Sequence, residues 1–250
     1  MHGMQTHLAR RGALTARLTE GPRDIEAALR LRHRIFCEDG HALPSASGLE
    51  QDVFDPFCDH LLLECPEAGL IGTCRLLPED RAAKGFYSAT EFAVEELLVR
   101  HPGLGFLEIG RSCIAPSHRS GAAAQLLWQA IWTYFRARKL DVMMGCASLE
   151  GTDPALHSQA LGFLGSHCLA PQEWDVRPVM PGIVLPVQET ASRPALRALP
   201  PLLKGYVRLG AYVASQAVVD EAFGTTDVFV VLPLSRIDPR YFNHFGAPNH

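Results

Sequence analysis

The sequence predicts a mixed α/β fold (α+β), with a central sheet that helices flank on both faces. Two observations support this class. Strand-like and helix-like segments alternate along most of the 250 residues, and one pair of strands is joined by a short turn, as in an antiparallel hairpin. Hydrophobic residues make up 47% and charged residues 20% of the chain, which is typical of a globular protein with a sizeable core.

The first expected elements are a strand at residues 13–19, where apolar and polar residues alternate, and a helix at residues 22–36. Pro22 and Asp24 are start signals for this helix. Arg32 takes a position on its apolar stripe, where an unpaired charge would be costly. We therefore expect Arg32 to bind an acidic partner or a substrate carboxylate.

A polar connector without periodicity, residues 37–59, follows the helix. Long ordered loops in compact domains are often functional. This loop ends in an acid-rich run that contains Glu50, Asp52 and Asp55. We expect these acids to take part in a binding site or to pair with buried cations.

The hairpin comes next, with strands at residues 60–65 and 70–77 joined by a Pro-Glu-Ala-Gly turn. Period-two alternation places Arg75 on the same face as Ile71 and Leu77. A second cation is therefore expected among apolar neighbours.

The later elements follow from the same patterns. Asp153 and Pro154 together mark a helix start, since aspartate is a good cap and proline fits the first helical position. The expected strands occupy residues 106–114, 141–148, 174–180 and 226–234, and the expected helices occupy the second half of 85–100, 121–138, 154–164 and 202–223.

The strand at 106–114 carries an acid and a base, Glu108 and Arg111. On a regular strand these side chains would face opposite sides. Gly110 lies between them, and an isolated glycine in a strand is typical of a β-bulge. A bulge would turn both charges to one side and free backbone N–H groups of residues 112–114 for a ligand.

The turn after this strand leads into a helix that is expected to begin at Gly121. The first N–H groups of a helix have no partner within the helix, and together with the helix dipole they attract phosphate groups. His118, Arg119 and Ser120 add further donors. We expect this turn to bind the phosphate of a bulky thioester donor, although the spacing alone equally fits an ordinary strand-to-helix connection.

Composition excludes several classes of protein. The net charge of −4 argues against general nucleic-acid binding. The seven cysteines contain no CxxC pair, so we expect reduced thiols and no metal site. Residues 1–13 form a basic arm without the apolar core of a signal peptide, and no apolar run reaches the ~18 residues of a membrane span. We expect a cytoplasmic protein, with peripheral contact at the inner face of the cytoplasmic membrane as the alternative.

Several motifs resemble known acyltransferases. The strand, turn and helix at residues 106–138 resemble the acyl-donor motif of the GNAT N-acyltransferase superfamily, in the degenerate form HRSGAA. Four segments in order resemble the acyl-homoserine-lactone synthases, namely LRHRIF with Arg32, E-x-D-x-x-D at 50–55, RLLP at 75–78 and E-x-x-R at 108–111.

Longer stretches resemble the ornithine-acyl-ACP N-acyltransferases of ornithine-lipid synthesis. They include FDPFCDHLLLE, GFYSATEF, LEIGRSC, LLWQAIWTYF, GCASLEGTD, PPLLKGYVRLGA and DEAFGTTDVFVVL. The resemblance implies a GNAT-like fold with a single domain at 14–250, in which 182–250 is a C-terminal helix-strand extension. It also implies transfer of a (3-hydroxy)acyl chain from acyl carrier protein to the α-amino group of L-ornithine, with no cofactor beyond this thioester co-substrate.

Amide formation from a thioester needs a base, because a free α-amino group has a pKa near ~8. Glu108 is the candidate base, directly or through a water, with Arg111 beside it in the family motif. The alternative role of Glu108 is that of a buried ion-pair partner. Ser148 and Tyr87 are candidate proton donors to the leaving thiolate.

The oxyanion would be held by backbone N–H groups of Ser112, Cys113 and Ile114. For Cys113, a core thiol is preferred to a nucleophile. Acyl carrier protein is acidic, so its docking residues are expected to be basic and close to the phosphate-binding turn. The candidates are Arg119, Arg136, Arg138 and Lys139.

The acceptor is a zwitterion, whose carboxylate suits Arg75 or Arg111. Glu50, Asp52 and Asp55 would attract the side-chain ammonium of ornithine. Alternatively, these acids pair with the buried arginines in one network that braces the loop, and the sequence leaves both roles open.

Four other functions remain as alternatives. The first is the same reaction on glutamine, glycine or lysine, and the second is an acyl-CoA-dependent small-amine acyltransferase. The third is an acyl-homoserine-lactone synthase, against which the C-terminal extension argues. The fourth is a non-enzymatic module that binds acyl-ACP or a lipid surface, against which the presence of both Glu108 and Arg111 argues.

Overall fold

A computed structural model describes residues 6–187, 196 and 199–237. The chain divides into two compact units, and each is described by itself. The described part of unit 1 consists of residues 6–84 and 109–140, and that of unit 2 lies within residues 85–108 and 141–237.

The strands of unit 1 pair in the order β1-β2-β3-β4-β5. Strand β5 is divided between the two units, and its residues from Ile109 onward belong to unit 1. The pairs β1–β2, β2–β3 and β3–β4 are antiparallel, which confirms the predicted hairpin. Part of the expected N-terminal arm is thus strand β1. The strands are β1 (His7–Arg11), β2 (Leu14–Leu18), β3 (Asp59–Cys65), β4 (Gly69–Pro78) and β5 (Phe106–Ile114).

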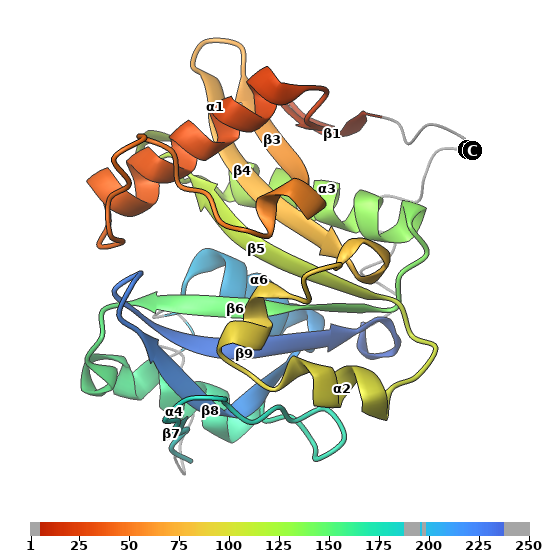
Figure 1. Ribbon diagram of the computed structural model, residues 1–250, viewed down its shortest axis with the longest axis vertical. Helices are drawn as coiled ribbons and strands as arrows, with labels where there is room; N and C mark the ends of the chain where they lie inside the picture. Colours follow the sequence, from red (N-terminus) through yellow and green to blue (C-terminus); the bar gives the residue numbers. More distant parts are fainter. Residues whose placement is uncertain (1–5, 188–195, 197–198, 238–250) are drawn as a thin grey trace. The chain divides into compact units, whose positions relative to one another are not determined.

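Two helices cover the strands of unit 1. Helix α1 (Pro22–His33) continues as a π-helical turn, Arg34–Glu38, and contacts β3 and β4. Helix α3 (Gly121–Ala137) contacts β1, β2 and β3. In Figure 1, α1 crosses in front of the strands of this unit and α3 lies behind them. The inward side of α3 is apolar, and its buried residues include Leu126, Leu127, Ala130, Ile131 and Tyr134.

The strands of unit 2 pair in the order β5-β6-β9-β8-β7, to which β5 contributes Phe106–Glu108. The β5–β6 pair is parallel and the other pairs are antiparallel. Across the described residues these pairings form a mixed sheet of nine strands, which confirms the predicted fold class. The further strands are β6 (Val142–Glu150), β7 (Ile183–Val184), β8 (Tyr212–Asp220) and β9 (Thr225–Pro233).

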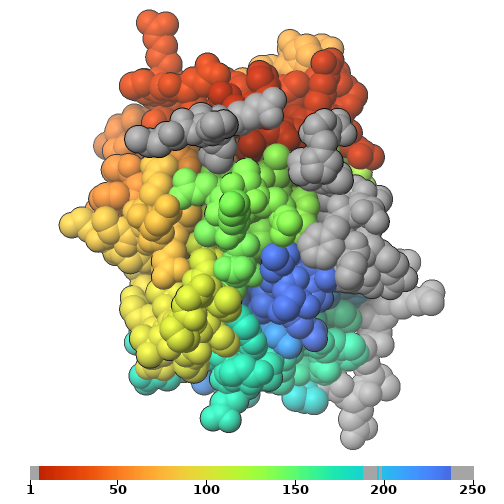
Figure 2. Space-filling view, turned by 90° about the vertical axis from the view of Figure 1, so that its right-hand side faces the viewer, coloured from red at the N-terminus to blue at the C-terminus, as the bar shows by residue number. Residues whose placement is uncertain are grey.

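The segment that contains α2 packs beside residues 170–180, and Figure 2 shows the two as adjacent yellow and teal surfaces. The backbone N–H of Ala93 donates to Arg177 O at 2.9 Å, and that of Val179 donates to Glu91 O at 2.8 Å. None of the described helices is long and apolar enough to cross a membrane. The helices of unit 2 are α2 (Val94–Arg100), α4 (Ser158–His167) and α6 (Pro201–Leu209), with 3-10 turns at Tyr87–Thr90 and Pro154–His157.

Two sequence predictions in unit 2 were wrong. The helix expected at 202–223 ends at Leu209, because Gly210 has φ 92° and caps it in the left-handed conformation. The chain then runs as β8 through Asp220. The strand expected at 174–180 is irregular and forms only an isolated bridge, between Phe92 and Pro178. Proline lacks the N–H that a ladder needs.

Candidate active site

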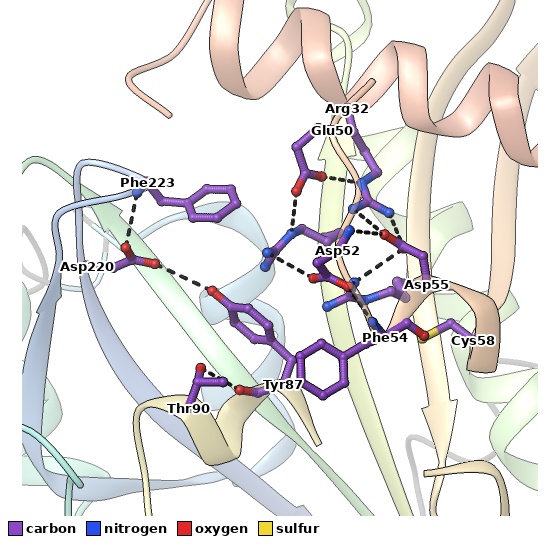
Figure 3. Close-up of polar contacts among 12 residues, drawn as sticks. Arg32, Glu50, Asp52, Phe54, Asp55, Cys58, Tyr87, Thr90, Asp220 and Phe223 are labelled. Carbon is purple, nitrogen blue, oxygen red and sulfur yellow. Dashed lines mark hydrogen bonds and ion pairs between the residues drawn. The ribbon is translucent and has the colours of Figure 1, made fainter. Parts of the chain in front are cut away.

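Unit 1 contains a buried network of arginines and carboxylates, which Figure 3 shows in close-up. The arginines come from three separate elements, α1, β4 and β5, whereas the acids all come from the connector between α1 and β3. The members are Arg32, Arg75, Arg111, Glu50, Asp52 and Asp55.

Arg32 lies at the centre of this network and is 0% exposed. Its Nε donates to Glu50 Oε2, and its Nη1 and Nη2 donate to the two Asp55 oxygens at 2.6 and 3.2 Å. The acidic partner predicted for this stripe arginine is therefore present.

The other two arginines complete the network. Arg75 Nη1 donates to Asp52 Oδ1 at 2.7 Å and to Asp55 Oδ1 at 3.3 Å. Arg111 donates from Nε to Glu50 Oε1 at 3.1 Å and from Nη2 to Asp52 Oδ2 at 3.3 Å. As a result, every oxygen of the three carboxylates accepts a hydrogen bond from an arginine.

The network contains three arginines and three carboxylates, so its formal charges balance. Burial of Asp55 opposes its ionisation, but the hydrogen bonds from Arg32 and the charges of Arg32 and Arg75 outweigh burial and lower its pKa to about 2. The backbone N–H of Asp52 adds a hydrogen bond to Asp55 Oδ2 at 2.8 Å. This geometry favours the bracing role of the acids over recognition of a substrate ammonium.

Strand β5 has an unusual backbone conformation beside Gly110, where a β-bulge stays a prediction. The irregular residue is the next one, Arg111, whose φ of 49° is rare outside glycine. A Cβ on Gly110 would lie 3.8 Å from Arg75 Nε, so the bare backbone runs beside that guanidinium. Unusual backbone conformations of this kind persist where surrounding contacts hold them, often at functional sites.

The expected phosphate-binding turn has the predicted form. A 3-10 turn, Pro116–His118, follows β5, and α3 begins at Gly121 with Ser120 as its cap, whose Oγ accepts from Ala123 N at 3.3 Å. No described atom lies within 4 Å of an ideal Cβ on Gly121, so the helix start faces open space. Arg119 is exposed and its Nε donates to Ile114 O at 3.1 Å. Binding of a donor phosphate at this turn stays a prediction. His118 is half-buried, and its predicted contact with that phosphate also stays a prediction.

The side chains before this turn have structural partners. Ser112 Oγ donates to Cys74 Sγ at 3.0 Å. Cys113 packs with Leu31 and Ile35, and burial raises its pKa to about 12, so the thiol is a poor nucleophile at neutral pH. An oxyanion role for the backbone of residues 112–114 remains a prediction.

The basic residues expected beside the turn lie at two separate places. Arg119 flanks the turn, whereas Arg136, Arg138 and Lys139 lie at the other end of the 17-residue helix α3. That length corresponds to about 25 Å at 1.5 Å per residue. Arg138 is also held by Asp80, to whose oxygens its Nη2 donates at 2.6 and 2.7 Å. Of the predicted docking residues, only Arg119 can therefore act at the phosphate-binding turn.

The predicted base, Glu108, belongs to unit 2 and is 3% exposed. Its Oε2 accepts from Tyr87 N at 2.8 Å and its Oε1 accepts from Ser88 N at 2.7 Å. Ser148 is exposed on β6, four residues beyond Met144, which is the register partner of Glu108. That is about 13 Å along the strand, so Ser148 is poorly placed to act with Glu108.

Unit 2 also contains an acidic cluster that sequence reasoning missed. Carboxylate oxygens of Glu91, Asp220 and Asp227 lie within 4.8 Å of one another. The signal was present in the sequence, because Asp227 interrupts the apolar strand TTDVFVVLP and is buried there. In Figure 3 the side chain of Tyr87 points toward Asp220, and the two oxygens are 3.5 Å apart.

The sequence of the chain is similar to those of known acyltransferases. The model of the acetyltransferase (GNAT) domain family matches residues 31–129. The chain is 44% identical to the L-ornithine N(alpha)-acyltransferase of Brucella abortus (strain 2308), with 96% of this chain and 91% of that relative covered. For the protein of the same name from Agrobacterium fabrum (strain C58), the identity is 43% and the coverage is 94% and 86%. The chain belongs to the L-ornithine N(alpha)-acyltransferase family.

The chain is thus an acyltransferase, as the sequence motifs predicted. Among solved structures, it is similar to the AHL synthase LasI, with a TM-score of 0.49, 12% identity, and 87% of this chain and 89% of that chain covered. The residues that match the GNAT domain contain the arginine–carboxylate network of the acyltransferase, its Glu108 and the first part of α3.

Proposed function

We propose that this acyltransferase moves a 3-hydroxyacyl chain from acyl carrier protein to the α-amino group of L-ornithine, forming the amide of a lyso-ornithine lipid. The observation that carries the proposal is the identity of 43–44% to relatives named for ornithine acylation, over more than nine tenths of this chain. The names of these relatives specify neither the acyl-ACP donor nor the lipid product. The contacts described next support these two parts of the proposal.

Glu108 is suited to receive the proton of the attacking amine. Each of its oxygens accepts one backbone N–H and keeps a further acceptor site, since a carboxylate has about four such sites. The amine nitrogen attacks the thioester carbonyl, the C–N bond forms, and the C–S bond breaks. The nitrogen gives its proton to Glu108, directly or through a water, and a proton passes from Glu108 to the leaving sulfur, so the carrier departs as a thiol and the carboxylate is restored.

The donor site in this proposal is the start of α3. The open space at Gly121, the N-terminal end of the helix dipole and the exposed Arg119 together suit a phosphate group, and Ser120 caps only the N–H of Ala123 in the first turn described. A phosphopantetheine arm presents one phosphate next to an acidic carrier surface. An exposed arginine beside the turn would contact that surface, which favours a carrier protein over coenzyme A.

The arginine–carboxylate network has a supporting role in this proposal. It fixes the connector and holds Arg111 in its unusual backbone conformation. Arg111 and Asp52 are its most exposed members, with side chains that are 10% and 20% exposed. The deeper members, Arg32, Asp55 and Arg75, are scaffold.

The test uses purified protein, 3-hydroxyacyl-ACP and single L-amino acids, with N-acyl products identified by mass spectrometry. We expect N-acylornithine as the main product and less turnover with the matched acyl-CoA. A product formed from glutamine, glycine or lysine in preference to ornithine would contradict the acceptor assignment. Equal turnover of acyl-CoA and acyl-ACP would contradict the donor assignment.

A further inference from the structure

The acids expected to bind the side-chain ammonium of the acceptor are already paired with arginines. Every carboxylate oxygen of Glu50, Asp52 and Asp55 accepts a hydrogen bond from an arginine. An ammonium that bound there would have to displace one of these fixed cations. A cationic side chain therefore needs other carboxylates.

The acidic cluster of unit 2, Glu91, Asp220 and Asp227, offers such carboxylates. One oxygen from each residue lies within 4.8 Å of the other two. Glu91 follows the 3-10 turn at Tyr87–Thr90, Asp220 ends β8, and Asp227 lies on β9. Asp220 is half-buried and its Oδ1 accepts from Ala222 N at 2.8 Å and Phe223 N at 3.1 Å, so its side chain is fixed by the turn.

A second observation points to a missing hydrogen-bond donor. Glu91 is 3% exposed, and hydrogen bonds from Cys146 and Tyr87 reach its carboxyl, but its Oε2 has no hydrogen-bond partner among the residues that the structure describes. Buried polar atoms nearly always have a partner, because an unsatisfied one is costly.

The electrostatics of the cluster favour a cation. Burial raises the pKa of Glu91 to about 8, and the negative charges of Asp227 and Asp220 add to this effect, while hydrogen bonds from Cys146 and Tyr87 oppose it. The charged groups that most affect this carboxyl are therefore acids. A cation placed among them would stabilise the ionised cluster.

The cluster is also connected to the proposed base. Glu108 accepts the N–H groups of Tyr87 and Ser88, and Glu91 lies one turn further along the same segment. Glu108 and the cluster therefore share one segment, and in this inference an amino acid whose α-amino group reaches Glu108 extends its side chain toward the cluster.

We infer that Glu91, Asp220 and Asp227 bind the side-chain ammonium of the amino-acid acceptor, and that this contact selects a diamino acid over a neutral one. A primary ammonium has three N–H donors and no acceptor, which matches three converging carboxylates. The inference rests on the proposed function, since it names the subsite that reads ornithine.

The experiment compares L-ornithine with L-norvaline, which has the same carbon chain without the ammonium. Steady-state kinetics are measured for the wild type, Glu91→Gln and Asp220→Asn, where asparagine keeps an oxygen for the turn. Glu96→Gln is the matched control, because Glu96 lies on α2 and pairs at the surface with Arg177. Thermal melts establish that each variant is folded.

We expect the wild type to prefer ornithine over norvaline by 100-fold or more in kcat/KM, the scale on which a site that bonds a polar group rejects an analogue that lacks it. Glu91→Gln should lower kcat/KM for ornithine by about 10- to 100-fold, as for the loss of one charge-assisted hydrogen bond. For norvaline the change should be under ~2-fold. Equal losses for both amino acids, or no preference in the wild type, would overturn the inference.

Calorimetric binding of both amino acids separates failure of the inference from failure of the proposed function. If no amino acid is acylated, but ornithine binds the wild type and not Glu91→Gln, the subsite stands and the reaction does not. If ornithine binds both equally, the subsite is refuted. Titration with Mg²⁺ or Mn²⁺ is the remaining arm, and a metal ion that binds through Glu91 and is required for ornithine turnover would also refute it.

Discussion

Replacing Asp55 with asparagine tests whether the connector acids are scaffold or substrate contacts. The change keeps the shape of the side chain and removes its charge. Asp55 is 7% exposed and accepts from both Arg32 and Arg75. Its loss leaves two buried guanidinium groups short of one negative charge, which costs about 3–5 kcal/mol when a buried pair is broken.

The pKa of Asp55 gives a second measure of the same contact. It falls from 3.8 to about 2 on folding, and each pKa unit is worth about 1.4 kcal/mol. The ionised carboxylate therefore contributes about 2 to 3 kcal/mol at neutral pH. Because the folded-state pKa is the lower one, this stability is present above pH 4 and is lost as the pH falls from about 4 to about 2.

Urea unfolding of the wild type and Asp55→Asn over pH 7 to 2.5 measures both quantities. We expect the variant to be less stable by roughly 2–5 kcal/mol at pH 7, with the gap closing below pH 4. Turnover of ornithine and norvaline should fall together as the connector loosens. A variant of unchanged stability that loses ornithine alone would refute the scaffold role and make Asp55 a substrate contact.

Three further predictions concern the reaction and its substrates. Glu108→Gln should lower kcat by ~100-fold or more without lowering Tm, and near-normal turnover with an unchanged pH profile would remove Glu108 as the base. Gly121→Asp should raise KM for acyl-ACP about 10-fold or more while Gly121→Ala has little effect, because a carboxylate stabilises a helix start but repels phosphate; equal KM values in both variants would argue against a phosphate site. Ornithine binding at pH 7 should release a proton from Glu91, whose pKa of about 8 leaves it protonated before the cation arrives, and the release should vanish above pH 9. Binding enthalpies that do not depend on the ionisation enthalpy of the buffer would contradict this. The groups that face the Glu91 carboxyl are Asp227, Asp220, Cys146 and Tyr87.

Local patterns predicted most of the fold. The strand at β5 and the helix α3 follow from alternation and from an apolar stripe, and both occur within a residue of the expected bounds. The helix expected at 202–223 was wrong because its second half is alanine- and valine-rich, a composition that fits either state. Gly210 is the sequence signal for the helix end, because glycine favours the left-handed conformation that ends α6.

The candidate site was predictable only in part. The position of Arg32 on the apolar stripe of α1 predicted an acidic partner, because an unpaired buried charge is costly. The acid-rich connector contained the candidates, and Glu50 and Asp55 are the partners observed. The roles of those acids depend on which arginine atoms reach each carboxylate oxygen, and the three-dimensional packing of the connector decides this, not spacing along the chain. The cluster of unit 2 joins Glu91 to Asp220 and Asp227, which lie close to the turn between β8 and β9. No spacing rule links Glu91 to residues so far along the chain.

The origin of the network partners has a consequence for how unit 1 folds. One short stretch of the connector supplies all three negative charges, while the positive charges arrive on α1, β4 and β5. Until all three elements have docked, at least one guanidinium or carboxylate would be dehydrated without its counterpart, so half-assembled states are penalised more than their lost apolar contacts alone would suggest. The last of these elements, β5, also carries the backbone irregularity at Arg111. We therefore expect the connector to become protected from hydrogen exchange in the same step as β5, in an all-or-none transition.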